Sequence, residues 1–84
     1  MDKNRVRWAS RRGMLELDLI LGPFVEENYD ALSADHQRLF HALLECEDQD
    51  LFGWFMKRVD PQQSELLQIV QIIRDSRNTP GARH

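Results

Sequence analysis

Two arginines, a glycine and a carboxylate form the stretch of this sequence that is best suited to contact another molecule. Arg11 and Arg12 directly precede Gly13, and Glu16 follows three residues later. Glycine adopts positive φ easily and lets a second backbone come close, because it has no side chain. An arginine and a carboxylate beside it could each form charge-assisted hydrogen bonds with a partner. The other interpretation is that Gly13 ends a helix and that its charged neighbours are solvated, since glycine after basic residues is a common helix stop.

The other polar residues give little indication of catalysis or metal binding. His36 and His41 are five residues apart, which does not place them on one helix face as a ligand pair requires. Cys46 lies between Glu45 and Glu47, and these carboxylates should raise the pKa of its thiol and make it a poor nucleophile. We therefore expect no catalytic residue, no metal site and no enzyme activity.

Length and composition predict one small soluble domain. The chain has 84 residues, of which 42% are hydrophobic and 30% charged, and this allows a single modest core. No apolar run approaches the roughly 20 residues that span a bilayer, and no signal-like leader opens the chain. We therefore expect a cytoplasmic protein that is not inserted in a membrane.

The net charge of −3 is unevenly distributed along the chain. Residues 1–12 carry five basic residues against one acid, residues 13–56 carry ten acids against one arginine, and residues 57–84 carry five basic residues against three acids. The acidic middle disfavours extended contact with nucleic-acid phosphates. We expect no nucleic-acid partner, although the basic N-terminal segment leaves a local phosphate-binding arm as an alternative, through Lys3, Arg5, Arg7 and Arg11.

Apolar residues recur at steps of three and four along the whole chain, which predicts helices and no sheet. The expected helices span about 3–12, 14–30, 34–45, 49–59 and 61–77. We therefore predict an all-α fold, a compact single-domain five-helix bundle over residues 1–77, with a flexible C-terminal tail over 78–84. The side chains expected in the core share the helical spacing: Leu17, Ile20, Leu21, Phe24, Val25, Leu39, Phe40, Leu43, Leu44, Leu51, Phe52, Trp54, Phe55, Met56, Val59, Leu66, Ile69, Val70 and Ile73.

Several residues are typical of helix ends. Ser33 is a plausible N-cap of the third helix, and Asp48 or Asp50 could cap the fourth. Asp60-Pro61 has the order expected at a helix start, an acidic cap followed by proline at the first position. Gly22-Pro23 should kink the second helix or make it restart, because proline removes a backbone donor and its ring crowds the preceding turn.

The sequence also resembles a known family, the succinate dehydrogenase assembly factors, which are the small FAD assembly factors or flavinators of bacteria and mitochondria. The resemblance covers nearly the whole chain and fails only in the tail after Arg77. Its strongest part is the run from Arg11 to Asp18, which contains an Arg-Gly-x-x-Glu pattern after a short basic helix. The other matching positions are Trp8, Pro23-Phe24, Tyr29-Asp30, Leu43-Leu44-Glu45-Cys46, Asp50-Leu51-Phe52 and Trp54.

The resemblance implies a five-helix fold and a binding role without catalysis. Such a factor would bind the flavoprotein subunit of succinate dehydrogenase or fumarate reductase as a monomer and promote covalent attachment of FAD to a histidine of that subunit. FAD would be handled on the partner and not bound stably by this chain. The residues implied at the partner surface are Trp8, Arg11, Arg12, Gly13, Glu16 and Asp18, of which Arg12, Gly13 and Glu16 match the motif. The alternatives are the antitoxin of a toxin–antitoxin pair and a small regulatory binding module.

Overall fold

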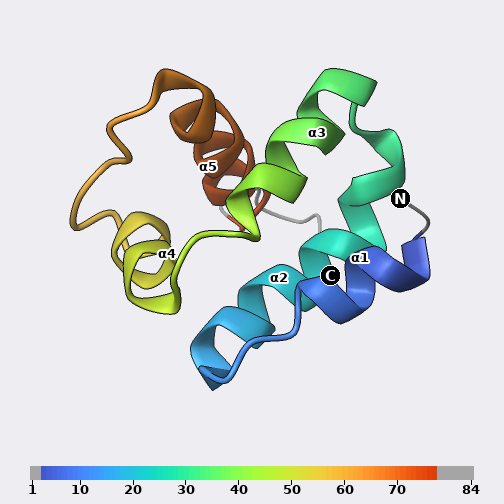
Figure 1. Cartoon of the computed structure of the whole chain (residues 1–84), viewed down its shortest axis with the longest axis horizontal. Helices are drawn as coiled ribbons and strands as arrows, with labels where there is room; N and C mark the ends of the chain where they lie inside the picture. Colours follow the sequence, from blue (N-terminus) through green and yellow to red (C-terminus); the bar gives the residue numbers. More distant parts are fainter. Residues whose placement is uncertain (1–2, 78–84) are drawn as a thin grey trace.

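The structure is a computed structural model that describes residues 3–77, and these residues form helices joined by short loops (Figure 1). The predicted tail over 78–84 lies outside the described residues. The described elements are five α-helices and one 3-10 helix, with no strand among them, so the predicted all-α five-helix fold is confirmed. In chain order they are α1 Lys3–Ala9, α2 Leu15–Asn28, the 3-10 helix η1 Tyr29–Ala31, α3 Ala34–Leu43, α4 Asp48–Phe55 and α5 Ser64–Arg77.

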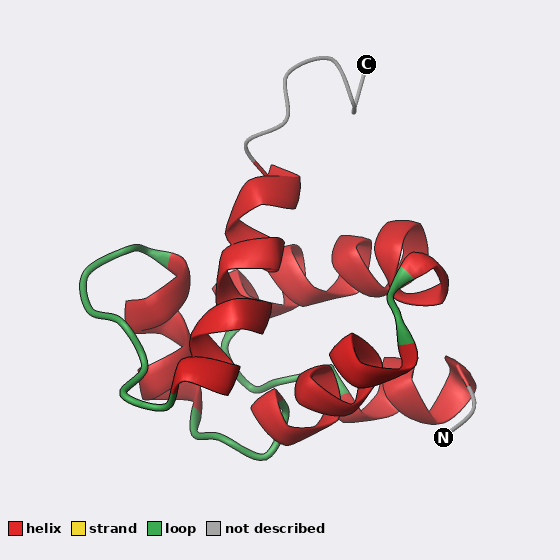
Figure 2. Cartoon of the chain, turned by 90° about the horizontal axis from the view of Figure 1, so that it is seen from above, coloured by secondary structure: helices red, strands yellow, loops and turns green. Residues whose placement is uncertain are grey.

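The helix α2 is at the centre of the packing, because it contacts α1, α4 and α5 (Figure 1). Seen from above, the described chain consists of helices and loops (Figure 2). The helix α5 also packs against α3 and α4. Trp54 is buried as predicted, but Val59 is exposed, because α4 ends at Phe55 and leaves Val59 in the following loop. The buried core comprises Val6, Leu17, Ile20, Leu21, Phe24, Val25, Tyr29, Phe40, Leu43, Leu44, Leu51, Trp54, Phe55, Ile69, Val70 and Ile73.

The helix α2 continues through Pro23, so the expected restart at this position is wrong. Proline cannot donate to the carbonyl of Leu19. Gly22 has no Cβ to collide with the proline ring, which removes part of the usual penalty for a helical residue before proline. Burial of the apolar side of α2 then stabilises the continuous helix.

Two expected helix starts are also corrected. The helix α5 begins at Ser64 and not at Pro61, because the Asp60 carboxylate accepts a hydrogen bond from Nη2 of Arg74 at 3.0 Å and Pro61 is buried ahead of the helix. The N-cap position of α4 is Glu47 and carries no side-chain cap, while Asp48 is turned toward Arg12. The cap of α3 is confirmed, since Ser33 Oγ accepts the His36 backbone N–H at 3.1 Å.

A hydrogen bond between aromatic side chains joins η1 to α3. Tyr29 Oη lies 2.6 Å from His41 Nε2, and the two rings are stacked with their centroids 5.8 Å apart. Burial lowers the pKa of the His41 imidazole below its usual value of 6.5. The folded state therefore favours the neutral imidazole.

This shift predicts a pH dependence of stability. Below pH 6.5 the unfolded chain takes up a proton at His41 more readily than the folded chain. The free energy of unfolding should therefore be fully retained above pH 6.5 and should decrease as the pH falls from 6.5 toward the lowered pKa. Urea unfolding at a series of pH values measures this slope, which should be smaller in His41→Gln and unchanged in the control His36→Gln on the same helix.

The end of α4 contains the one non-glycine residue with positive φ in the described part of the chain. Lys57 has φ of 61° directly after the C-cap Met56, and the Arg58 backbone N–H donates to the carbonyl of Gly53 at 2.9 Å. Glycine is preferred at this position of a helix end, because a Cβ disfavours the left-handed conformation.

We expect Lys57→Gly to stabilise the fold by about 1 kcal/mol, the usual cost of placing a residue with a Cβ in the left-handed region. The measurement is chemical unfolding monitored by circular dichroism. Arg58→Gly is the matched control, because the φ of Arg58 is not positive and glycine there only adds freedom to the unfolded chain. An equal gain in both variants would show that the backbone of Lys57 is not strained.

Candidate partner-binding surface

The turn between α1 and α2 leaves Gly13 open to solvent. The helix α1 ends at Ala9, so the interpretation of Gly13 as its C-cap is wrong, and the φ of Gly13 lies outside the left-handed region that glycine adopts easily. A Cβ built on Gly13 would have nothing within 4 Å. Nothing in the described chain therefore requires a glycine here, and the open space lies on the outside of the molecule.

The side chain of Arg12 ties this turn to the loop between α3 and α4. Its Nε donates to Asp48 Oδ1 at 2.7 Å, its Nη1 to the carbonyl of Leu44 at 2.8 Å and its Nη2 to the carbonyl of Cys46 at 2.8 Å. These carbonyls follow the last turn of α3, where backbone acceptors lack helical donors. We call this set of three hydrogen bonds the Arg12 clasp. Only 15% of the Arg12 side-chain surface is exposed.

The clasp corrects the expected role of the Arg12 guanidinium. All three of its nitrogens donate within the chain, so the fork does not face a partner's carboxylate. Asp18 also acts inside the chain, because its Oδ1 accepts the Arg12 backbone N–H at 2.7 Å. Arg12 and Asp18 therefore position the turn on which Gly13 is exposed.

The other residues singled out in the sequence lie at the surface. Trp8 has 75% of its surface exposed, and the Arg11 guanidinium lies 5.9 Å from the centre of its ring. Arg11 and Glu16 are also exposed. We call the exposed set Trp8, Arg11, Gly13 and Glu16 the corner surface.

Two further exposed residues were missed by the sequence analysis. Leu15 and Leu19 each have 66% of their surface exposed. The signal was present in the sequence, because both fall outside the buried stripe that begins at Leu17 and continues at Ile20 and Leu21. An apolar residue off the core stripe is expected at the surface.

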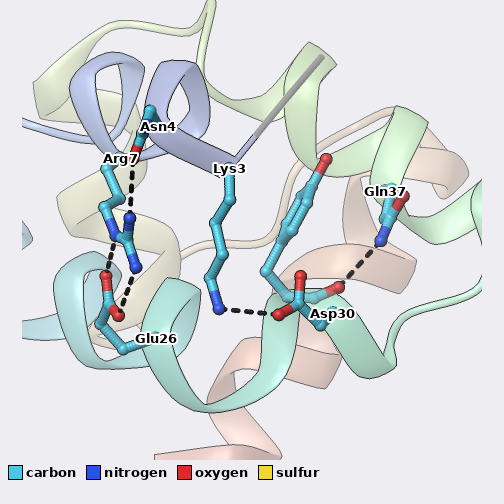
Figure 3. Close-up of polar contacts among 7 residues, drawn as sticks. Lys3, Asn4, Arg7, Glu26, Asp30 and Gln37 are labelled. Atoms are coloured by element: carbon cyan, nitrogen blue, oxygen red, sulfur yellow. Dashed lines mark hydrogen bonds and ion pairs between the residues drawn. The ribbon is translucent and has the colours of Figure 1, made fainter.

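The basic N-terminal segment is largely neutralised by acids of the middle segment (Figure 3). Lys3 Nζ lies 2.8 Å from Asp30 Oδ2, and Arg7 forms a two-point ion pair with Glu26. A groove of about 290 Å³ between α1 and α2 is bordered by this pair. These cations are therefore less available for phosphate groups than the sequence alone suggests.

The pKa of the Cys46 thiol is raised as predicted, but the main cause is burial and not the adjacent carboxylates. Burial raises the pKa of its thiol, and the charge of Asp50 adds to the shift. Its Sγ lies 3.8 Å from the carbonyl oxygen of Ala42. The residues that the structure describes contain no group of three or more His, Cys, Asp or Glu that could hold a metal ion.

None of the described helices is long and apolar enough to cross a membrane. The fold and the corner surface define a class of small all-α proteins that expose apolar and charged side chains at one helix junction. Within this class, the chain belongs to the family described as flavinator of succinate dehydrogenase, which matches residues 4–77.

Relatives from several bacteria carry the name FAD assembly factor SdhE. The protein of Pseudomonas aeruginosa is 56% identical over 71 residues, which cover 84% of both chains. That of Yersinia pseudotuberculosis is 52% identical over 80 residues, or 95% of this chain and 91% of the relative. That of Idiomarina loihiensis is 46% identical over 72 residues, or 86% and 80%. None of these names mentions an antitoxin, so that alternative gains no support.

We expect the Arg12 clasp to contribute to stability. Arg12→Lys keeps the charge but cannot reach three acceptors, so it should lower the free energy of unfolding by about 2 kcal/mol, in the range of hydrogen bonds that involve charged groups. Arg7→Lys is the matched control, because the Arg7–Glu26 pair is about half exposed and such pairs contribute about 0–1 kcal/mol. Chemical unfolding of both variants tests this. Equal losses would show that the clasp is no stronger than a surface ion pair.

Proposed function

We propose that this chain is an assembly factor that binds the flavoprotein subunit of succinate dehydrogenase, or of the related fumarate reductase, and promotes covalent attachment of FAD to it. The observation that carries the proposal is the open space outside Gly13, which the chain itself does not use. A partner backbone could approach there, beside the exposed Glu16 and Trp8. The family membership and the names of the relatives point to the same partner.

In this proposal the chain acts by positioning and not by catalysis. Covalent flavin attachment is chemistry of the flavin and its acceptor histidine, so a helper needs only to hold the subunit in a reactive arrangement. FAD is then the cargo of the partner.

The rigidity of the corner surface fits a positioning role. Arg12 fixes the turn through acceptors on two other segments of the chain, and Asp18 fixes the Arg12 backbone. A pre-ordered surface loses little conformational entropy when it binds. Arg12 and Asp18 therefore support the surface from within, while Gly13 and Glu16 would contact the partner.

The test is coexpression of this chain with an apo flavoprotein subunit, with covalent flavin read by in-gel fluorescence and binding by pull-down. The wild-type chain should form a stable complex and increase covalent flavin. Gly13→Arg should leave the monomer folded, because the added side chain has open space, but should abolish binding by occupying the place of the partner backbone. Normal binding of Gly13→Arg would refute the assigned surface.

A pair of acidic variants serves as the internal comparison. Glu16→Ala should weaken the complex by about 2 kcal/mol or more, the typical cost of removing one side of a charge pair that becomes buried at an interface. Glu27→Ala, an equivalent truncation about three turns farther along α2, should have little effect. Equal effects would place the interface elsewhere on the helix.

A further inference from the structure

The outer side of α2 carries a line of apolar side chains that begins beside Gly13. Leu15 and Leu19 lie one turn apart and Pro23 follows one turn later, so the three occupy nearly the same side of the helix. Leu15 and Leu19 are largely exposed and Pro23 is half-buried. We call these three residues the α2 stripe.

The fold does not explain the two leucines. The core side of α2 is formed by other residues, among them Leu17, Ile20 and Leu21, all of which are buried. Polar residues at positions 15 and 19 would keep that side unchanged and would avoid exposing large apolar side chains to water. Adjacent exposed leucines of this kind are typical of a surface that becomes covered on binding.

The chain's own C-terminal segment is a poor cover for the stripe. Arg77, the last described residue, lines a hollow of about 200 Å³ together with Leu19 and Pro23, so residues 78–84 follow directly from this place. Those residues read Asn-Thr-Pro-Gly-Ala-Arg-His and include no large aliphatic or aromatic side chain. They cannot bury two leucines effectively.

The charges around the α2 stripe indicate which kind of partner surface could cover it. Glu16 is exposed next to Leu15. The Arg12 clasp binds the carbonyls of Leu44 and Cys46, which flank Glu45 in the chain. Glu45 and Glu47 are both exposed. The exposed carboxylate of Glu16 therefore lies directly beside the N-terminal end of the stripe, and a complementary surface is apolar with a basic side chain at its edge.

We infer that the α2 stripe is the apolar anchor of the complex, and that it is covered by an apolar patch of the flavoprotein subunit bordered by a lysine or arginine that pairs with Glu16. This inference rests on the proposed function, because it takes the flavoprotein subunit as the partner. The interface then extends from Gly13 along α2, with the leucines providing affinity and Glu16 providing orientation.

The experiment measures the dissociation constant of the full-length chain for the apo flavoprotein subunit by isothermal titration calorimetry. Leu15→Gln and Leu19→Gln should each weaken binding about tenfold and the double variant about a hundredfold, because most of each leucine becomes buried only in the complex. Thermal unfolding of the variants should match the wild type, since both positions are exposed. Val59→Gln is the matched control, because Val59 is 57% exposed but lies in the loop after α4.

The charge of the partner is tested separately by salt. Added salt should weaken binding of the wild type more than binding of Glu16→Gln, because only the wild type has the ion pair at the edge of the stripe. The same salt dependence in both proteins would contradict a basic partner residue at Glu16.

The outcomes separate this inference from the proposed function. If the double leucine variant binds as tightly as the wild type while Gly13→Arg does not bind, the stripe is not an anchor and the assembly role stands. If the wild type does not bind the flavoprotein subunit, both fail. A wild-type dimer in sedimentation velocity that dissociates in the double leucine variant would also overturn the inference, because a second copy would then cover the stripe.

Discussion

The Arg12 clasp is the contact on which the geometry of the corner surface depends. One guanidinium links the turn before α2 to the end of α3 and, through Asp48, to the start of α4. Arg74 makes an analogous contact at the other end of α4, where Nε donates to the carbonyl of Trp54 at 2.8 Å and Nη2 to Val59 and Asp60. Both arginines satisfy backbone carbonyls at or beyond helix C-termini, and a cation there also interacts favourably with the helix dipole.

The structural features that the sequence predicted correctly depend on residues that are close together in the chain. The buried stripe of α2 follows from its spacing, and Ser33 caps α3 because its acceptor and the His36 amide are only three residues apart. The expected caps of α4 and α5 failed because Asp48 and Asp60 are engaged by arginines 36 and 14 residues away. Helix-end rules consider only hydrogen bonds between neighbouring residues. In both cases the carboxylate instead accepts a hydrogen bond from an arginine that is distant in the sequence.

The same limit explains why the direction of the Arg12 side chain was not predicted. Sequence identified the Arg-Gly-x-x-Glu stretch, but it could not show that Arg12 turns inward while Glu16 remains exposed, since this depends on the position of the α3–α4 loop. Leu15 and Leu19 were missed for a simpler reason. Attention to the apolar residues that fit the core stripe leaves out those that do not, and on α2 the second group is the exposed one.

The two glycines with contrasting surroundings, Gly13 and Gly53, show how a structural requirement differs from one imposed by a partner. A Cβ on Gly53 would lie 3.3 Å from Cγ2 of Val59, so a side chain there would require Val59 to shift by a few tenths of an ångström. A Cβ on Gly13 would meet nothing, and its backbone does not need the left-handed region. A glycine at an exposed turn that is needed neither for close packing nor for a left-handed backbone adds freedom to the unfolded chain and therefore costs stability. In the proposed complex, a partner backbone approaches over the missing side chain, and this contact would offset the lost stability.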